Sequence, residues 1–121
     1  MTKEQYISKN YMNEDQFQAA TFMYLNNNYP ELRGLLFHVP NEGAKSKFEG
    51  AKLKSMGVVA GVPDLILVSP MCGIELKMPN GRLSPSQNEL HKTWLSAGVP
   101  CYVCWNAIEV VELFQTKLKN K

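Results

Sequence analysis

Three charged residues interrupt the most apolar stretch of this sequence. The segment from residue 61 to residue 78 reads GVPDLILVSPMCGIELKM, with Asp64, Glu75 and Lys77 set among aliphatic side chains. Burying ionised groups is costly unless they are paired with each other or bind a metal ion. The sequence therefore predicts that these three side chains form a functional cluster.

A hairpin would bring the three charges to one face of a sheet. If its loop is centred at Pro70 and the next residue, Asp64 pairs with Lys77 and Ile66 pairs with Glu75. Residues two apart on a strand point the same way, and diagonal cross-strand neighbours lie about 7 to 8 Å apart. Two carboxylates at that distance can close around a hard cation, Mg²⁺ or Mn²⁺, which can polarise a phosphoryl oxygen and acidify a bound water.

Lys77 would lie beside that water. Its ammonium group can hold the attacking water or stabilise negative charge that develops at phosphorus. The same spacing also fits a plain ion pair between Asp64 and Lys77, with Glu75 at an exposed edge, because such short patterns recur by chance. Spacing alone leaves both interpretations open.

The elements that position these residues follow from apolar periodicity and capping signals. Asn13 and Ser84 are typical N-caps, while Pro30 and Gly98 mark helix ends. We expect helices over 14–28, 45–56, 85–97 and 107–118 and strands over 35–39, 64–68, 73–78 and 99–105. This order predicts an α/β domain with a mixed four-stranded sheet and helices on its faces.

Composition fits one globular domain. The chain has 121 residues, of which 45% are hydrophobic and 20% charged, and a net charge of +2. We expect a single domain over 13–121, with residues 1–12 loosely held. The sequence has no apolar run near the roughly 20 residues of a membrane-spanning helix, and its few cysteines suggest reduced thiols in a cytoplasmic protein.

The charged motif also resembles a known family. GVPD at 61–64 followed by ELK at 75–77 resembles the PD-(D/E)XK nuclease motif, and the wider pattern resembles the VRR-NUC domain. The further residues of that pattern are Glu14, Gln18, Asn41, Gly43 and the LSPSQ run at 83–87. The resemblance spans about residues 14–114. It implies a restriction-endonuclease-like core in a stand-alone domain of the kind encoded by phages and some bacteria.

The resemblance also implies roles for individual residues. It makes Asp64 and Glu75 ligands of the metal, with the carbonyl group of Leu76 as a backbone ligand. Lys77 becomes the catalytic lysine. Glu14 corresponds to an acidic residue of the first helix that reaches the metal or its waters.

Gln87 corresponds to a glutamine in the helix that follows the second motif strand. However, Gln87 also completes a capping box with Ser84, and Glu14 could simply favour the start of its helix. Arg-rich signatures of the family are absent, because Asn41, Glu42 and Gly43 stand where some relatives have a basic turn.

A run of positive charge lies between residues 45 and 54, where Glu49 is the single acidic residue. Its lysines are Lys45, Lys47, Lys52 and Lys54. Such a run is usually a solvated helix face. Near a metal site, however, its lysines could bind the phosphates of DNA, a contact that does not depend on the base sequence. Arg82, in a turn, is a further candidate for a phosphate contact.

The cysteines and histidines of the sequence do not indicate a metal site. Cys101 and Cys104 lie three apart on a strand, so they point to opposite faces and are expected to be core thiols. His38 and His91 have no ligand partner at metal spacing, and we assign neither a role from the sequence.

Together these features predict a Mg²⁺-dependent, structure-selective DNA endonuclease that resolves Holliday junctions as a homodimer. Two symmetric cuts suit a two-fold dimer of a small domain, and the resemblance implies the same for stand-alone members. The alternatives are a monomeric nuclease for flaps or single strands and a non-catalytic DNA-binding or assembly subunit that retains the fold.

Overall fold

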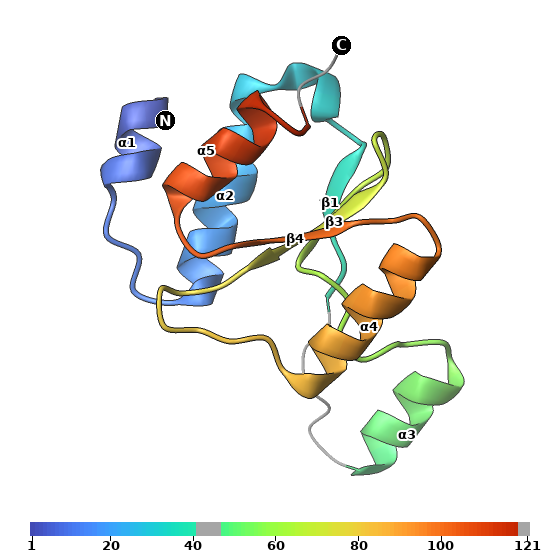
Figure 1. The fold of residues 1–121 in the computed structure, drawn as a ribbon. Coiled ribbons are helices and arrows are strands. Elements are labelled where there is room, and N and C mark those ends of the chain that lie inside the picture. Colours follow the sequence, from blue (N-terminus) through green and yellow to red (C-terminus); the bar gives the residue numbers. More distant parts are fainter. Residues whose placement is uncertain (41–46, 119–121) are drawn as a thin grey trace.

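The computed structural model describes residues 1–40 and 47–118 and confirms an α/β fold (Figure 1). The elements lie close to the ranges expected from the sequence. In chain order they are α1 (Lys3–Ser8), α2 (Glu14–Asn28), the 3₁₀ helix η1 (Pro30–Leu32), β1 (Leu36–His38), α3 (Lys47–Ser55), β2 (Leu65–Leu67), β3 (Cys72–Leu76), α4 (Pro85–Ser96), β4 (Cys101–Cys104) and α5 (Ala107–Gln115).

The four strands form one mixed sheet in the order β1-β2-β3-β4. The pairs β1–β2 and β2–β3 are antiparallel, whereas β3 and β4 are parallel. A parallel pair needs a crossover connection, which α4 supplies. The expected mixed four-stranded sheet is therefore confirmed.

The register of the central hairpin differs from our expectation by two residues. Leu65 pairs with Ile74 and Leu67 pairs with Cys72, so the loop is centred between Ser69 and Pro70. Continuing this register by one pair places Asp64 opposite Glu75, where we expected Lys77. Because the shift is even, every side chain keeps its expected face.

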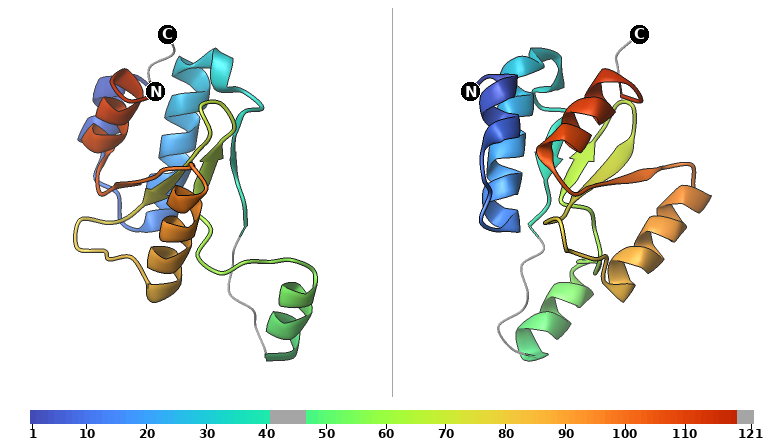
Figure 2. Two further views of the ribbon diagram at one scale, coloured as in Figure 1. Left: turned by 45° about the vertical axis from the view of Figure 1, so that its right-hand side comes forward. Right: turned by 60° about the vertical axis from the view of Figure 1, so that its left-hand side comes forward.

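Different helices pack on the two faces of the sheet. Leu65, Leu67, Ile74 and Leu76 belong to the main hydrophobic cluster with side chains of α2 and α5. Glu75 and Lys77 alternate with these residues and therefore point to the opposite face. Figure 2 shows α1, α2 and α5 on one side of the sheet and α4 on the other, so the charged residues lie on the α4 side.

The N-terminus is more ordered than expected. Residues 3–8 form α1, whose Tyr6 is fully buried against α2. The Tyr6 hydroxyl lies 2.6 Å from Thr21 Oγ1, and its ring stacks on Tyr24 at 4.6 Å between centroids. A single buried aromatic residue thus anchors a segment that we expected to be loosely held.

Among the helices within the described residues, none is both long and apolar enough to span a membrane.

Candidate active site

Asp64 and Glu75 lie together on adjacent strands. Asp64 directly precedes β2, and its Oδ2 accepts a hydrogen bond from the backbone N–H of Leu76 at 2.7 Å. Glu75 lies within β3 and is 1% exposed. The sequence placed these two carboxyl groups in one cluster, and the structure brings them together.

This proximity changes the proton affinity of Glu75. Burial, the neighbouring Asp64 and, least of all, Glu14 raise the pKa of Glu75 to about 9, although Lys77 acts in the opposite direction. Without a cation the pair therefore holds a proton at neutral pH. A bound cation would remove the repulsion between the two carboxylates.

Lys77 is buried next to this pair, with only 8% of its surface exposed. Its backbone N–H donates to the carbonyl oxygen of Cys104, which ties the end of β3 to β4. Over the described residues, Lys77 forms no salt bridge with Asp64 or Glu75. The plain ion-pair interpretation is therefore wrong, and the ammonium group remains available for a ligand.

His91 joins the cluster from α4, a contact that the sequence did not suggest. Its Nε2 lies 3.3 Å from Glu75 Oε1, and its side chain is 12% exposed. Burial lowers the pKa of His91, and the charge of Lys77 lowers it further. His91 follows Gln87 by one helical turn, so the two side chains share a face of α4. This spacing is the sequence feature from which the position of His91 at the site could have been predicted.

Gln87 has the capping role that the sequence left open. Its backbone N–H donates to Ser84 Oγ, and its own Oε1 accepts a hydrogen bond from Ser84 N at 2.8 Å. The side chain also lines a cleft beside Asp64. Gln87 therefore caps α4 and faces the candidate site.

Close packing fixes the start of α4 against the segment before Asp64. Gly61 has a φ of +90°, and a Cβ there would lie 2.4 Å from the carbonyl oxygen of Ser86. Only glycine fits this approach. The glycine of the GVPD motif thus positions Gln87 beside Asp64.

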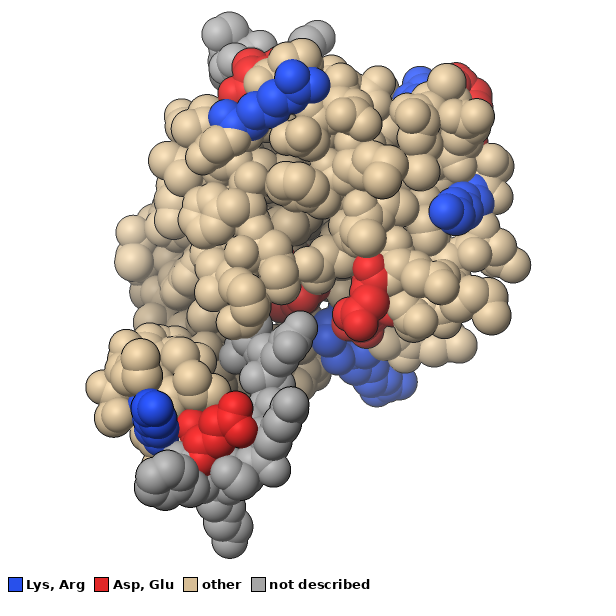
Figure 3. Space-filling model, turned by 180° about the vertical axis from the view of Figure 1, so that it is seen from behind, with Lys and Arg blue, Asp and Glu red and all other residues tan. Residues whose placement is uncertain are grey.

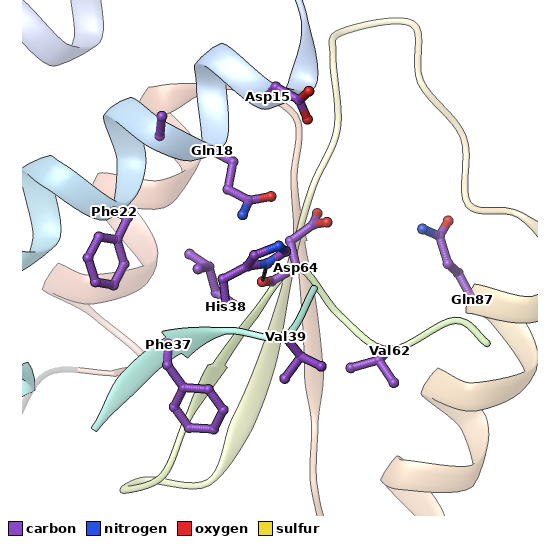
Figure 4. Close-up of a pocket in the computed structure, with 11 residues that line it drawn as sticks. Asp15, Gln18, Phe22, Phe37, His38, Val39, Val62, Asp64 and Gln87 are labelled. Carbon is purple, nitrogen blue, oxygen red and sulfur yellow. Dashed lines mark hydrogen bonds between the residues drawn. The ribbon is translucent and has the colours of Figure 1, made fainter. Parts of the chain in front are cut away.

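The cleft has a volume of about 620 Å³ and is formed by α2, β1, the segment before β2 and the start of α4. Figure 4 shows Gln18 and Gln87 pointing into it from opposite sides of Asp64. Asp15, rather than Glu14, lines the cleft. Glu14 is exposed, and its link to the site is the electrostatic effect on Glu75.

The donor set suits a hard cation. The described residues contain no group of three or more His, Cys, Asp or Glu side chains arranged to hold a metal, as a zinc site would require. Mg²⁺, by contrast, needs only one or two carboxylates and retains several waters. Asp64 and Glu75 fit that demand. Leu76 contacts Asp64 through its N–H, so the role of its carbonyl group as a ligand stays a prediction.

The predicted phosphate-binding residues do not line the cleft in the described part of the chain. Lys52 and Lys54 are exposed near the end of α3, and Arg82 is exposed before α4. Lys45 and the side chain of Lys47 lie outside the described residues. From behind, acidic atoms occupy a hollow with basic atoms beside them (Figure 3).

The cysteines form no disulfide in the described residues. Cys72 and Cys104 are buried, and burial raises the pKa of Cys72 to about 11 and that of Cys104 to about 12. Cys101 is partly exposed. The expectation of core thiols at Cys101 and Cys104 is therefore confirmed for Cys104, whereas Cys101 is only partly buried.

Comparison with known proteins agrees with this fold. The family model described as the VRR-NUC domain matches residues 3–107. A solved structure titled "VRR_NUC domain protein" shares 26% identity at a TM-score of 0.75, with 92% of each chain covered. A second, "VRR_NUC domain", shares 20% identity at a TM-score of 0.56, covers 82% of this chain and 95% of its own, and supports the fold alone. No curated protein matches. The chain belongs to the VRR-NUC domain family of nucleases.

Proposed function

We propose that the protein is a Mg²⁺-dependent endonuclease that hydrolyses phosphodiester bonds in DNA; Mn²⁺ is the other cation that suits its donors. The observation that supports this most is the adjacent pair Asp64 and Glu75, with a buried Lys77 beside it that forms no salt bridge within the described residues. A cation bound by the two carboxylates would polarise the phosphoryl oxygen and acidify a water molecule.

The other residues have supporting roles in this proposal. Lys77 holds the attacking water or stabilises negative charge at phosphorus. The electrostatic attraction between its ammonium group and that charge is strong because the group is buried in a low dielectric. His91 Nε2 lies 3.3 Å from Glu75 Oε1, so with Glu75 ionised by a bound cation it would donate to that carboxylate and fix its orientation. Glu14 reaches the outer waters, and Gln87 orients ligands from the start of α4.

A substitution at Glu75 tests the assignment. Glu75→Gln keeps the shape of the side chain but removes a charged ligand, so metal-dependent nicking of supercoiled DNA should fall at least about 100-fold. Glu31→Gln, on the exposed η1, is the matched control and should cleave like the wild type. Both should melt at temperatures near that of the wild-type chain.

The substrates for this assay are supercoiled, linear, single-stranded and branched DNA with Mg²⁺, Mn²⁺ or EDTA. Full activity of Glu75→Gln in Mg²⁺ would contradict the assignment. If the wild-type chain cleaves none of these with either metal, the non-catalytic alternative, a DNA-binding or assembly subunit, is correct.

We further propose that the active form is a homodimer that cuts branched DNA, including Holliday junctions. A four-way junction needs two symmetric cuts, which a two-fold dimer provides. Apolar side chains that follow α3 support a partner surface, because Met56, Val58 and Val59 are exposed in the single chain. The alternative is a monomeric nuclease for flaps or single strands.

A further inference from the structure

The cleft beside Asp64 has an apolar wall that the catalytic residues do not explain. Phe22 of α2 and Phe37 of β1 line it together with Val39 and Val62. Phe37 is 40% exposed on the edge strand of the sheet. Exposing an aromatic ring to water is unfavourable, so this wall suits a ligand with an apolar face.

The described lining of the cleft offers no cationic side chain to a phosphate that lies against the apolar wall. Its lining includes the carboxylates of Asp15 and Asp64 and no Lys or Arg among the described residues. Away from a cation held by Asp64 and Glu75, these carboxylates would repel a phosphate, whereas the base of a nucleotide is neutral. The acidic lining therefore favours the base on the apolar wall, while the phosphate would stay at the cation beside Lys77.

The polar groups in the cleft match the edge of a nucleobase. The amide of Gln18 can both donate and accept hydrogen bonds, whereas Oε1 of Gln87 already accepts from Ser84 N and leaves its amino group as a donor. His38 Nδ1 lies 2.6 Å from the carbonyl oxygen of Asp64, and since a carbonyl only accepts, Nδ1 bears the proton. In the neutral ring, Nε2 is then an acceptor, which suits an exocyclic amino group.

We propose that this cleft binds one unpaired nucleobase of the DNA, next to the phosphodiester that is cleaved. The inference rests on the proposed function, because Asp64 belongs both to the cleft and to the candidate metal pair. The volume of about 620 Å³ lies in the usual range for small-ligand sites. A base in a continuous duplex is stacked inside the helix, so the cleft selects DNA with an unpaired nucleotide.

Fluorescence of 2-aminopurine tests this without any cleavage. Single-stranded and branched oligonucleotides that contain one unpaired 2-aminopurine are titrated with the full chain in EDTA. Stacking on Phe37 should quench the fluorescence of the wild-type complex. Phe37→Ala should weaken binding by about 5- to 150-fold, because stacking of one base is worth about 1 to 3 kcal/mol, and should reduce the quenching.

Three comparisons make the result specific. Phe37→Trp should restore the quenching, since it supplies another aromatic face. Met71→Ala, at a residue of similar exposure (44%) in the hairpin loop, should bind like the wild type. On a continuous duplex, Phe37→Ala should also bind like the wild type. Phe37 is partly exposed, so Phe37→Ala is expected to fold, and thermal melting verifies this.

The outcomes separate this inference from the proposed function. Unchanged binding and quenching in a folded Phe37→Ala variant would overturn the nucleobase site, even if Glu75→Gln abolishes cleavage. Conversely, loss of quenching in Phe37→Ala would support the site even if no DNA is cleaved. Equal losses on duplex and unpaired DNA would also overturn it, because the cleft would not be selective for unpaired bases.

Discussion

At the scale of single residues, Glu75 shows how burial and chemistry are connected. A carboxyl group that is 1% exposed requires polar partners, and here these are Asp64, His91 and the neighbouring Lys77. Of these three residues, His91 is the one that comes from outside the hairpin, because it belongs to α4. The orientation of Glu75 therefore depends on α4.

We predict that His91 positions Glu75 for metal binding. His91→Phe keeps a ring but removes the donor to Glu75 Oε1, so the affinity for Mn²⁺ should fall by about 10- to 100-fold, the usual effect of losing such a partner. Electron paramagnetic resonance of free Mn²⁺ measures this affinity without DNA. His91→Gln, which keeps a donor, should restore part of it.

The same substitution should lower kcat more than it raises KM for DNA, because His91 contacts Glu75 and not the substrate. The neighbouring Lys92 is exposed, and Lys92→Gln serves as the control on the same helix. An unchanged Mn²⁺ affinity in His91→Phe would show that the contact is only structural.

Residue types predicted the cluster but not its full membership. Asp64, Glu75 and Lys77 could be predicted because period-two alternation places them on one face of the hairpin. The register was off by two because the geometry of the loop between β2 and β3 decides it, and the sequence does not reveal that geometry. His91 was missed because it lies on the crossover helix α4, 16 residues after its partner Glu75.

At the scale of elements, capping signals predicted α2 and α4 well, and apolar periodicity predicted α5. Asn13, Ser84 and Asn106 all accept hydrogen bonds at their helix starts. The helix α1 was missed because it is short and buries one residue, Tyr6. The cleft could not be predicted either, since α2, β1 and α4 meet there from distant parts of the sequence.

The helix α3 lies apart from the sheet (Figure 1), which leaves its lysines free to contact DNA. We predict that Lys52 and Lys54 bind phosphates. On duplex DNA, each such contact contributes about 0.9 to the slope of log affinity against log salt. The double variant Lys52→Gln and Lys54→Gln should therefore flatten this slope by about 1.8, as measured by fluorescence anisotropy between low and moderate salt.

A matched double variant separates local contacts from net charge. Lys3→Gln with Lys9→Gln removes the same total charge from the N-terminal region around α1, where both lysines are exposed. It should leave the slope close to that of the wild type. An unchanged slope in the Lys52 and Lys54 variant would place the DNA on another surface.

At the scale of the whole molecule, the part of the chain that the structure describes presents one candidate site. Glu75 and Lys77 lie on the α4 side of the sheet, while α1, α2 and α5 cover the other face (Figure 2), and the cleft beside Asp64 lies between α2 and the start of α4. A single site makes a single cut in each binding event. Coordinated cleavage of both strands of a junction therefore requires a second copy of the chain.

We predict that two chains associate through the apolar residues that follow α3. Sedimentation equilibrium at micromolar concentration should give twice the mass of one chain, and Met56→Ser with Val59→Ser should shift it toward one chain. Removing exposed apolar side chains weakens an interface without opening a core, so the variant should remain folded. Met23→Ser, exposed on α2, is the control and should remain dimeric.

The cutting pattern on a four-way junction connects this association to function. In the wild type, paired cuts should occur within one binding event, because the two-fold dimer presents two sites at once. The monomeric variant should instead nick one strand. A wild-type mass of one chain, with faster cutting of flaps than of junctions, would establish the monomeric alternative.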